Sequence, residues 1–275
     1  MRRVVLVLTD GLRPDAVTAG GMPSLYALGR EYARAVNART IRPSATVAAL
    51  ASLATGVAPE THGLVKPGLD FLSRLSSLRP VGRELGRHGL STTVVAGDMS
   101  PAARAVSWTL AAAAGAGSLV ASGRRARETA ASAAETIASG KSHLTMVYLP
   151  DCDQAGHAFG WMSGPYLSAA AEVDAAIADL MRWVGDALVI VLADHGGGGV
   201  RPTEHDDPHP LNDAIPLVLA GGSVRRRTVV SDPTSLLDVP PTILWALHVP
   251  VPECYEGRVI REAFAPALPA EAVAI

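Results

Sequence analysis

The sequence predicts an α/β fold, a mostly parallel central sheet with helices on both faces, built by residues 1–275 as a single domain. Two observations support this fold class. Short apolar runs alternate with helical stretches along the whole chain, as in proteins built on parallel sheets. The chain has 275 residues, of which 48% are hydrophobic and 18% charged, so it can bury a large core. We find no internal repeat or sharp linker, and expect at most a small cap.

The expected strands are short runs that are continuously apolar and rich in β-branched residues. Such runs are typical of strands that are covered on both faces. They occupy Val4–Thr9, Thr92–Ala96, Leu144–Leu149, Leu188–Ala193 and Ile215–Ala220.

The expected helices lie between these runs. They occupy Met22–Tyr32, Thr46–Ala54, Val81–Arg87, Arg125–Ala138 and Tyr166–Val184. In the last of them, apolar residues recur close to helical spacing from Leu167 to Met181. The segment Trp108–Ser122 is rich in Ala and Gly, and fits either a loosely packed helix or a connection.

Charge and composition argue against several classes of partner. A formal net charge of −2 gives no reason to expect a nucleic-acid polymer or a membrane surface. No segment has the roughly 18 apolar residues of a membrane span. The start Met1–Leu8 mimics a signal peptide, but Asp10 ends the apolar run early and no small-residue cleavage pattern follows. Cys152 and Cys254 do not form a disulfide framework, so we expect a reduced, cytoplasmic protein.

Acidic residues follow several of the expected strands, at the sheet edge where ligands of α/β proteins bind. Asp10 follows the first strand, and Gly11 allows a sharp turn after it. Alone, Asp10 could equally cap the next segment. No G-x-G-x-x-G accompanies it, which disfavours a dinucleotide site.

The segment after the strand at Leu144–Leu149 contains an aspartate and a histidine four residues apart. Asp153 and His157, with Gly156 between them, can reach one ion from a tight turn. Asp151 competes with Asp153, but the spacing to the Gly-His pair favours Asp153.

Adjacent Asp194 and His195 are the most specific local signal in the chain. On a continuing strand they would point to opposite faces, so they can share an ion only if the backbone bends. The glycines at 196–199 allow that bend. The alternative is an exposed loop acid beside an unrelated histidine. Downstream, His205 is favoured over His209 as a further ligand.

A hydroxyl residue opens the small-residue helix at Thr46. Ser44 or Thr46 can be an ordinary N-cap. Thr46 can instead present its oxygen where helix N–H groups attract an anion. Three carboxylates and three imidazoles are a ligand set for two divalent metals, and their presence favours the functional interpretation of Thr46.

His62 is better explained as a structural residue. The proposed site comprises Asp10, Thr46, Asp153, His157, Asp194, His195 and His205.

The order of these motifs resembles the alkaline phosphatase superfamily. The motifs are Asp-Gly, Pro-Ser-x-Thr, Thr-Gly-x-x-Pro-Glu-x-His-Gly, Asp-x-x-Gly-His and Asp-His-Gly, followed by a later His. The nearest resemblance is to the type I phosphodiesterase/nucleotide pyrophosphatase branch, which includes phosphonoacetate hydrolases, and it spans nearly the whole chain.

This resemblance implies a phosphoric ester hydrolase with two metal ions, expected to be zinc, although such sites also accept manganese or iron. It assigns one ion to Asp10, Asp194, His195 and the Thr46 oxygen, and the other to Asp153, His157 and His205. Thr46 would attack phosphorus and form a phospho-threonine intermediate. The alternatives are a phosphonate (C–P) hydrolase and a phosphomonoesterase, each acting on a small phosphate- or phosphonate-containing substrate. A non-catalytic metal binder is disfavoured because it needs no nucleophile.

The sequence departs from the nucleotide pyrophosphatase pattern in one stretch. That pattern has an Asn shortly after the His-Gly, where this chain has none. Lys66 is a candidate cationic donor to the substrate there, or a solvated loop charge. Aromatic residues make up 4% of the chain, which leaves few side chains to stack on a nucleoside base.

Overall fold

An eight-stranded sheet forms the centre of the computed structural model, which describes residues 3–65, 74, 78–97, 111–123 and 125–265. The strand order is β5-β4-β6-β1-β7-β8-β2-β9, and a second, two-stranded sheet pairs β10 with β3. The strands are β1 Val4–Thr9, β2 Ala33–Ala35, β3 Ala38–Arg39, β4 Thr92–Ala96, β5 Ser118–Ala121, β6 Leu144–Leu149, β7 Leu188–Leu192, β8 Leu217–Ala220, β9 Thr228–Val230 and β10 Thr234–Ser235.

Only one strand of the large sheet runs against the others. The pairs from β5 to β7 are all parallel, β8 is antiparallel to both β7 and β2, and β9 is again parallel to β2. In the centre, β1 lies between β6 and β7, with Leu8 opposite Tyr148 on one side and Leu192 on the other. The carboxyl ends of these three strands therefore meet at one edge of the sheet.

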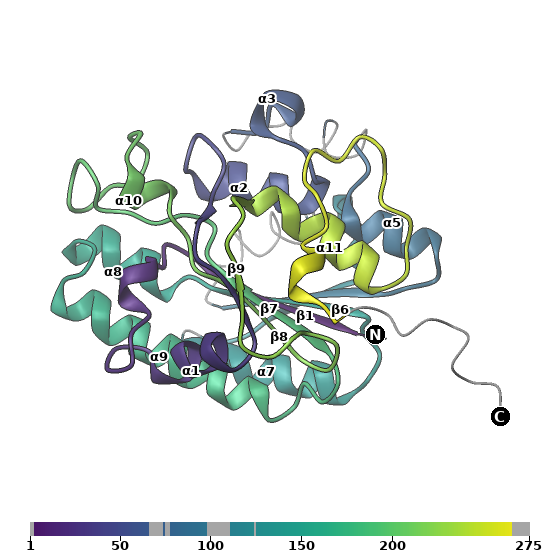
Figure 1. Ribbon diagram of the computed structural model, residues 1–275, viewed down its shortest axis with the longest axis horizontal. Coiled ribbons are helices and arrows are strands. Elements are labelled where there is room, and N and C mark those ends of the chain that lie inside the picture. The colour runs from purple at the N-terminus through teal and green to yellow at the C-terminus, as the bar shows by residue number, and fades with distance from the viewer. Residues whose placement is uncertain (1–2, 66–73, 75–77, 98–110, 124, 266–275) are drawn as a thin grey trace.

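Helices cover both faces of the sheet (Figure 1). The α-helices are α1 Pro23–Glu31, α2 Thr46–Thr55, α3 Pro59–His62, α5 Val81–Arg87, α7 Ala126–Ala138, α8 Asp151–Phe159, α9 Gly164–Met181, α10 Pro210–Asp213 and α11 Val239–Ala246. Single 3₁₀ turns lie at Pro14–Ala16, Leu236–Asp238 and Arg261–Ala263. Helices α1, α7 and α9 pack on one face, and α2, α5 and α11 pack together on the other. This arrangement confirms the predicted fold class.

The central strands form where the sequence is uniformly apolar. Every residue of β1 and of β7 is buried, as expected for strands covered on both faces. No helix of the described residues is long and apolar enough to cross a membrane.

In two places the structure departs from expectation. Within the segment Trp108–Ser122, residues 108–110 lie outside the described part of the chain and residues 111–113 are helical, but Ser118–Ala121 form a strand, β5, which was not expected and pairs in parallel with β4. The turn expected between Asp153 and His157 is a helix, α8, so these residues lie one helical turn apart on the same side.

Candidate metal centre and nucleophile

The candidate site lies at the carboxyl ends of three neighbouring strands. Asp10 follows β1, Asp194 follows β7, and Asp153 lies in the first turn of α8 after β6. Hydrogen bonds join the segments that contain these residues. The Asp153 N–H donates to the Asp10 carbonyl at 3.0 Å, and the Gly11 N–H donates to Asp194 Oδ1 at 3.1 Å. Sheet order alone therefore brings these acids together from distant parts of the sequence.

Gly11 is required by this arrangement. Its φ of +68° lies in the left-handed region, and a Cβ there would lie 2.9 Å from the Cα of Asp153. Any other residue would be strained and would push α8 away from β1.

Each of the three carboxylates has a buried oxygen without a hydrogen-bond partner among the described residues. These atoms are Oδ1 of Asp10, Oδ1 of Asp153 and Oδ2 of Asp194. In two of the acids the other carboxylate oxygen accepts hydrogen bonds. Asp10 Oδ2 accepts one from the Tyr148 hydroxyl, and Asp194 Oδ1 accepts one each from the N–H groups of Gly11 and His195. Buried polar atoms are rarely left unpaired, so three such oxygens at one place indicate a missing positive partner.

The three candidate histidines share one pattern of hydrogen bonding. In each, Nδ1 lies within hydrogen-bond distance of a backbone carbonyl: 2.9 Å for His157 and Thr203, 2.8 Å for His195 and Gly196, and 2.6 Å for His205 and Ser44. A carbonyl only accepts, so Nδ1 donates its proton in all three. The neutral ring then has its lone pair on Nε2, which is the form that binds a metal.

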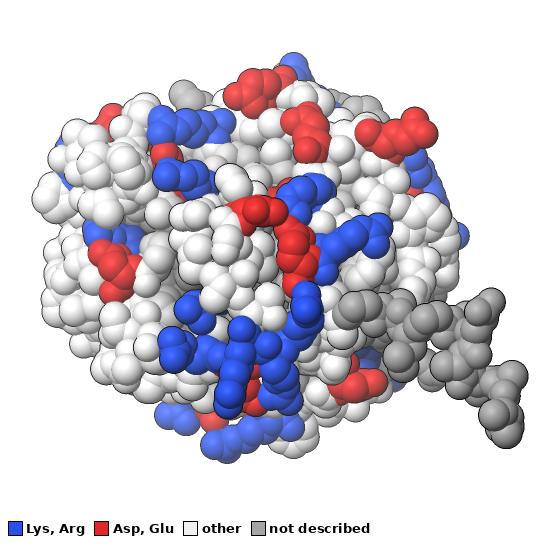
Figure 2. Space-filling view, viewed as in Figure 1, with Lys and Arg blue, Asp and Glu red and all other residues white. Residues whose placement is uncertain are grey.

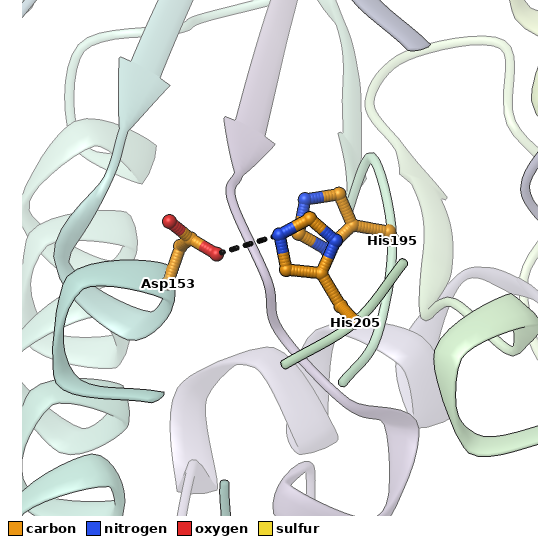
Figure 3. Close-up of side chains that lie close together, drawn as sticks. All are labelled: Asp153, His195 and His205. Atoms are coloured by element: carbon orange, nitrogen blue, oxygen red, sulfur yellow. Dashed lines mark ion pairs between the residues drawn. The ribbon is translucent and has the colours of Figure 1, made fainter. Parts of the chain in front are cut away.

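The Nε2 atoms of these histidines point toward the unpaired carboxylate oxygens. His195 Nε2 lies 3.2 Å from Asp10 Oδ1 and 3.6 Å from Asp194 Oδ2. His157 Nε2 and His205 Nε2 lie 3.4 Å and 3.8 Å from Asp153 Oδ1. Figure 3 shows Asp153 facing the stacked rings of His195 and His205, whose centroids are 3.9 Å apart.

Two groups of donors are close enough to hold an ion. The ligand atoms of Asp10, Asp194 and His195 all lie within 4.8 Å of one another, and so do those of Asp153, His195 and His205. The first group is the one expected from the sequence. In the second group His195 takes the place expected for His157, whose ring instead lies beside that of His205 at 5.0 Å. The two donor groups therefore have His195 in common and lie next to each other.

Thr46 lies beside the first group. Its Oγ1 is 3.1 Å from His195 Nε2, at the first residue of α2. Neither Ser44 nor Thr46 is the N-cap, because that position is Ala45, which has no side-chain cap. Ser44 instead donates its hydroxyl to the His205 carbonyl at 2.6 Å. This bond joins the segment before α2 to the loop that contains His205.

The competing residues have other partners. Asp151 Oδ1 accepts the N–H of Ala126 at the start of α7, and His209 accepts the N–H of Leu211 at the start of α10. His62 is buried, as expected of a structural residue, and lies 3.0 Å from the Ser52 hydroxyl. Lys66 lies outside the described residues.

Two aromatic residues that the sequence reasoning missed support the site. The Tyr148 hydroxyl donates to Asp10 Oδ2. Trp161 Nε1 donates to the Gly11 carbonyl at 2.8 Å, and its ring packs edge-on against His157 and His205. Tyr148 is the penultimate residue of β6, and this position beside the strand that precedes Asp10 was the available signal.

The ionisation of the site reflects an excess of negative charge. Burial and the nearby Asp10 charge raise the pKa of Asp194, and the same two causes raise the pKa of Asp153 to about 6. Burial acts to raise the pKa of Asp10 too, but the hydrogen bond and charge of His195 outweigh it and the pKa is lowered. Burial opposes a charged His195, yet Asp194 and Asp10 raise its pKa to about 10. Such crowded carboxylates fit divalent cations, whose positive charge would lower the pKa of each of these four groups.

The fold is similar to that of solved hydrolases. A phosphonate monoester hydrolase from Silicibacter pomeroyi superposes with a TM-score of 0.70 at 17% identity, covering 98% of this chain and 78% of that one. A 2-O GAG sulfatase superposes with a TM-score of 0.74 at 12% identity, covering 96% of this chain and 74% of that one. At such identities the similarity concerns the fold.

Comparison of sequences finds a relative that matches over part of the chain and a family that matches over most of it. A 2,3-bisphosphoglycerate-independent phosphoglycerate mutase from Cellvibrio japonicus (strain Ueda107) is 30% identical over 127 residues, which are 45% of this chain and 24% of that protein. The chain thus spans about a quarter of that relative. A match that covers most of the chain, over residues 4–69 and 100–239, confirms the resemblance: the chain belongs to the Type I phosphodiesterase / nucleotide pyrophosphatase family.

Proposed function

We propose that this protein is a metal-dependent phosphoric ester hydrolase that acts through a phospho-threonine at Thr46. One observation carries the proposal: buried, unpaired oxygens of three aspartates and the Nε2 atoms of three histidines converge beside the Thr46 hydroxyl. The family match supports the reaction class.

The donors suit two divalent ions. Asp10, Asp194 and His195, with the Thr46 oxygen, would hold one ion. Asp153, His157 and His205 would hold the other. Mixed nitrogen and oxygen donors in sets of three or four suit zinc, and manganese or iron also bind such sets. When bound, a pair of such ions supplies positive charge that stabilises a phosphoryl group during displacement.

The residues of the chain position the nucleophile and the phosphoryl group. Thr46 loses its hydroxyl proton and Oγ1 attacks phosphorus, forming a new P–O bond while the ester P–O bond breaks and the leaving oxygen takes up a proton to depart as the alcohol. Water then attacks the phospho-threonine, so that the Oγ1–P bond breaks and a proton from the water restores the hydroxyl. Since Thr46 opens α2, the N–H groups of the first turn are available to the phosphoryl oxygens.

The nucleophile is tested by Thr46→Ala, with Thr61→Ala as control because, among the described residues, the Thr61 hydroxyl bonds only to the exposed Glu256. We expect Thr46→Ala to lose roughly a thousandfold or more in turnover of bis-p-nitrophenyl phosphate, while Thr61→Ala retains it. Zinc content, measured by elemental analysis, should remain close to that of the wild type in both. Normal turnover by Thr46→Ala would show that another group attacks phosphorus.

The substrate class is tested separately. We propose a phosphodiester as substrate, with a phosphomonoester or a phosphonate as the alternatives. Comparing kcat/KM for bis-p-nitrophenyl phosphate, p-nitrophenyl phosphate and phosphonoacetate distinguishes the three. A preference for phosphonoacetate with release of phosphate would identify C–P hydrolysis instead.

A further inference from the structure

A concave region lies beside helix α1. It is a cavity of about 380 Å³ between α1, the segment from β2 to β3, and the beginning of β8. None of the seven candidate metal-site residues lines it. Any ligand of this cavity would therefore bind separately from the metal centre.

Three arginines line this cavity without an acidic partner. Arg30, Arg34 and Arg39 all border it, and no acidic residue is among its lining residues. Among the described residues, none of the three forms an ion pair, and the one hydrogen bond that Arg34 Nη1 donates goes to the Gly29 carbonyl at 3.3 Å. By contrast, Arg42 pairs with Asp213 nearby.

The surface around the cavity is also basic. Figure 2 shows Lys and Arg side chains gathered over α1 and β9, at the lower centre of this face. Arg226 belongs to this region, because its guanidinium lies 4.0 Å from the centre of the Tyr32 ring, and it pairs with Glu31. Because no acidic residue of the described chain forms an ion pair with the three cavity arginines, their positive charge is available to attract an anion.

The other lining residues are mainly apolar. Those with accessible surface include the exposed Tyr26 and Val36 and the half-buried Val17, Ala35 and Ala214. Guanidinium groups bind carboxylate, phosphate and sulfonate oxygens with parallel N–H donors, whereas an apolar lining favours a hydrocarbon or aromatic body. The volume is in the range that holds a small molecule.

We propose that this cavity binds a small organic anion with at least two negative charges and a compact apolar body. A concave site of this size suits such a ligand better than a nucleic-acid strand, which needs an extended basic groove with aromatic stacking residues.

The binding test uses naphthalene-1,5-disulfonate, which has two charges, an aromatic body and no hydrolysable bond. We expect one molecule to bind per chain by isothermal titration calorimetry. The double variant with Arg30→Gln and Arg39→Gln should bind at least about tenfold more weakly. Arg127→Gln is the matched control, because Arg127 lines a different groove where it pairs with Asp179. It should bind the probe within about twofold of the wild type.

Two further measurements separate this cavity from other sites. The titration is repeated on zinc-loaded protein and on protein freed of metal by dialysis against a chelator. Equal binding supports the proposal, whereas binding that requires zinc would place the probe at the metal centre and overturn it. Equal loss in Arg127→Gln would also overturn it. So would arginine-dependent binding of a single-stranded DNA oligonucleotide with none of the disulfonate. Unfolding midpoints of all variants confirm that each is folded.

Discussion

The bond between Tyr148 and Asp10 allows a quantitative prediction about the metal centre. Tyr148→Phe keeps the ring but removes the hydroxyl that donates to Asp10 Oδ2, while Asp10 Oδ1 still faces His195. Hydrogen bonds to a charged group contribute about 1.5–3 kcal/mol. Removing a group that orients a metal ligand lowers metal affinity by about 10–100-fold, which corresponds to about 1.4–2.7 kcal/mol. The two ranges agree, so we expect zinc affinity to fall by one to two orders of magnitude.

The assay is a competition for zinc between the metal-free protein and a chromophoric chelator. Tyr255→Phe is the control, because its hydroxyl donates at 2.7 Å to the Arg79 carbonyl, which belongs to neither donor group. This control should lose about 1 kcal/mol of unfolding free energy in urea and keep its zinc affinity. If both variants bind zinc as tightly as the wild type, the Tyr148 hydroxyl does not orient Asp10 for a metal, and the reasoning fails.

Two further predictions concern the packing of the site and the acid stability of the fold. Gly197→Ala should lower the unfolding free energy by about 1–3 kcal/mol in urea, since its Cβ would lie closer than 3.0 Å to the Trp161 ring. Gly86→Ala, whose Cβ would meet no atom within 4 Å, should show no such loss, and equal effects would exclude overpacking as the cause. Glu84 is 1% exposed, and the hydrogen bond from Arg79 is the main cause that lowers its pKa, with Arg87 adding to it. A lowered folded-state pKa stabilises the protein above the ordinary value of about 4.5, and this contribution is lost as the pH falls through the folded-state pKa. Glu84→Gln should therefore flatten the fall in unfolding free energy between about pH 5 and pH 3, and parallel curves for variant and wild type would contradict this.

The parts of the fold that could be predicted are those whose pattern is complete within one segment. Val4–Thr9 and Val81–Arg87 have the expected bounds, because a buried strand and an amphipathic helix each show their period locally. The position of the acids at strand ends was also readable, since it follows from the general rule for parallel sheets.

The parts that could not be predicted depend on partners far away in the sequence. Strand β2 has three residues and β3 has two, too short for an alternating pattern, and both exist because of the strands beside them. The turn expected at Asp153–His157 relied on Gly156, a residue that disfavours helix. This glycine is instead required because a Cβ would lie 2.6 Å from the Trp161 ring. The place of His195 in both donor groups arises from its stacking on His205, which no local pattern encodes.

The carbonyl acceptors behind the three imidazoles have a consequence for how this site can vary. Every residue type has a main-chain carbonyl, so exchanging the side chains of Thr203, Gly196 or Ser44 leaves each acceptor in the chain. The protonation pattern of the histidines is thus set by the path of three loops and not by the identity of their residues. Sequence drift in those loops can reshape the rim of the site while the imidazoles keep the same nitrogen turned inward.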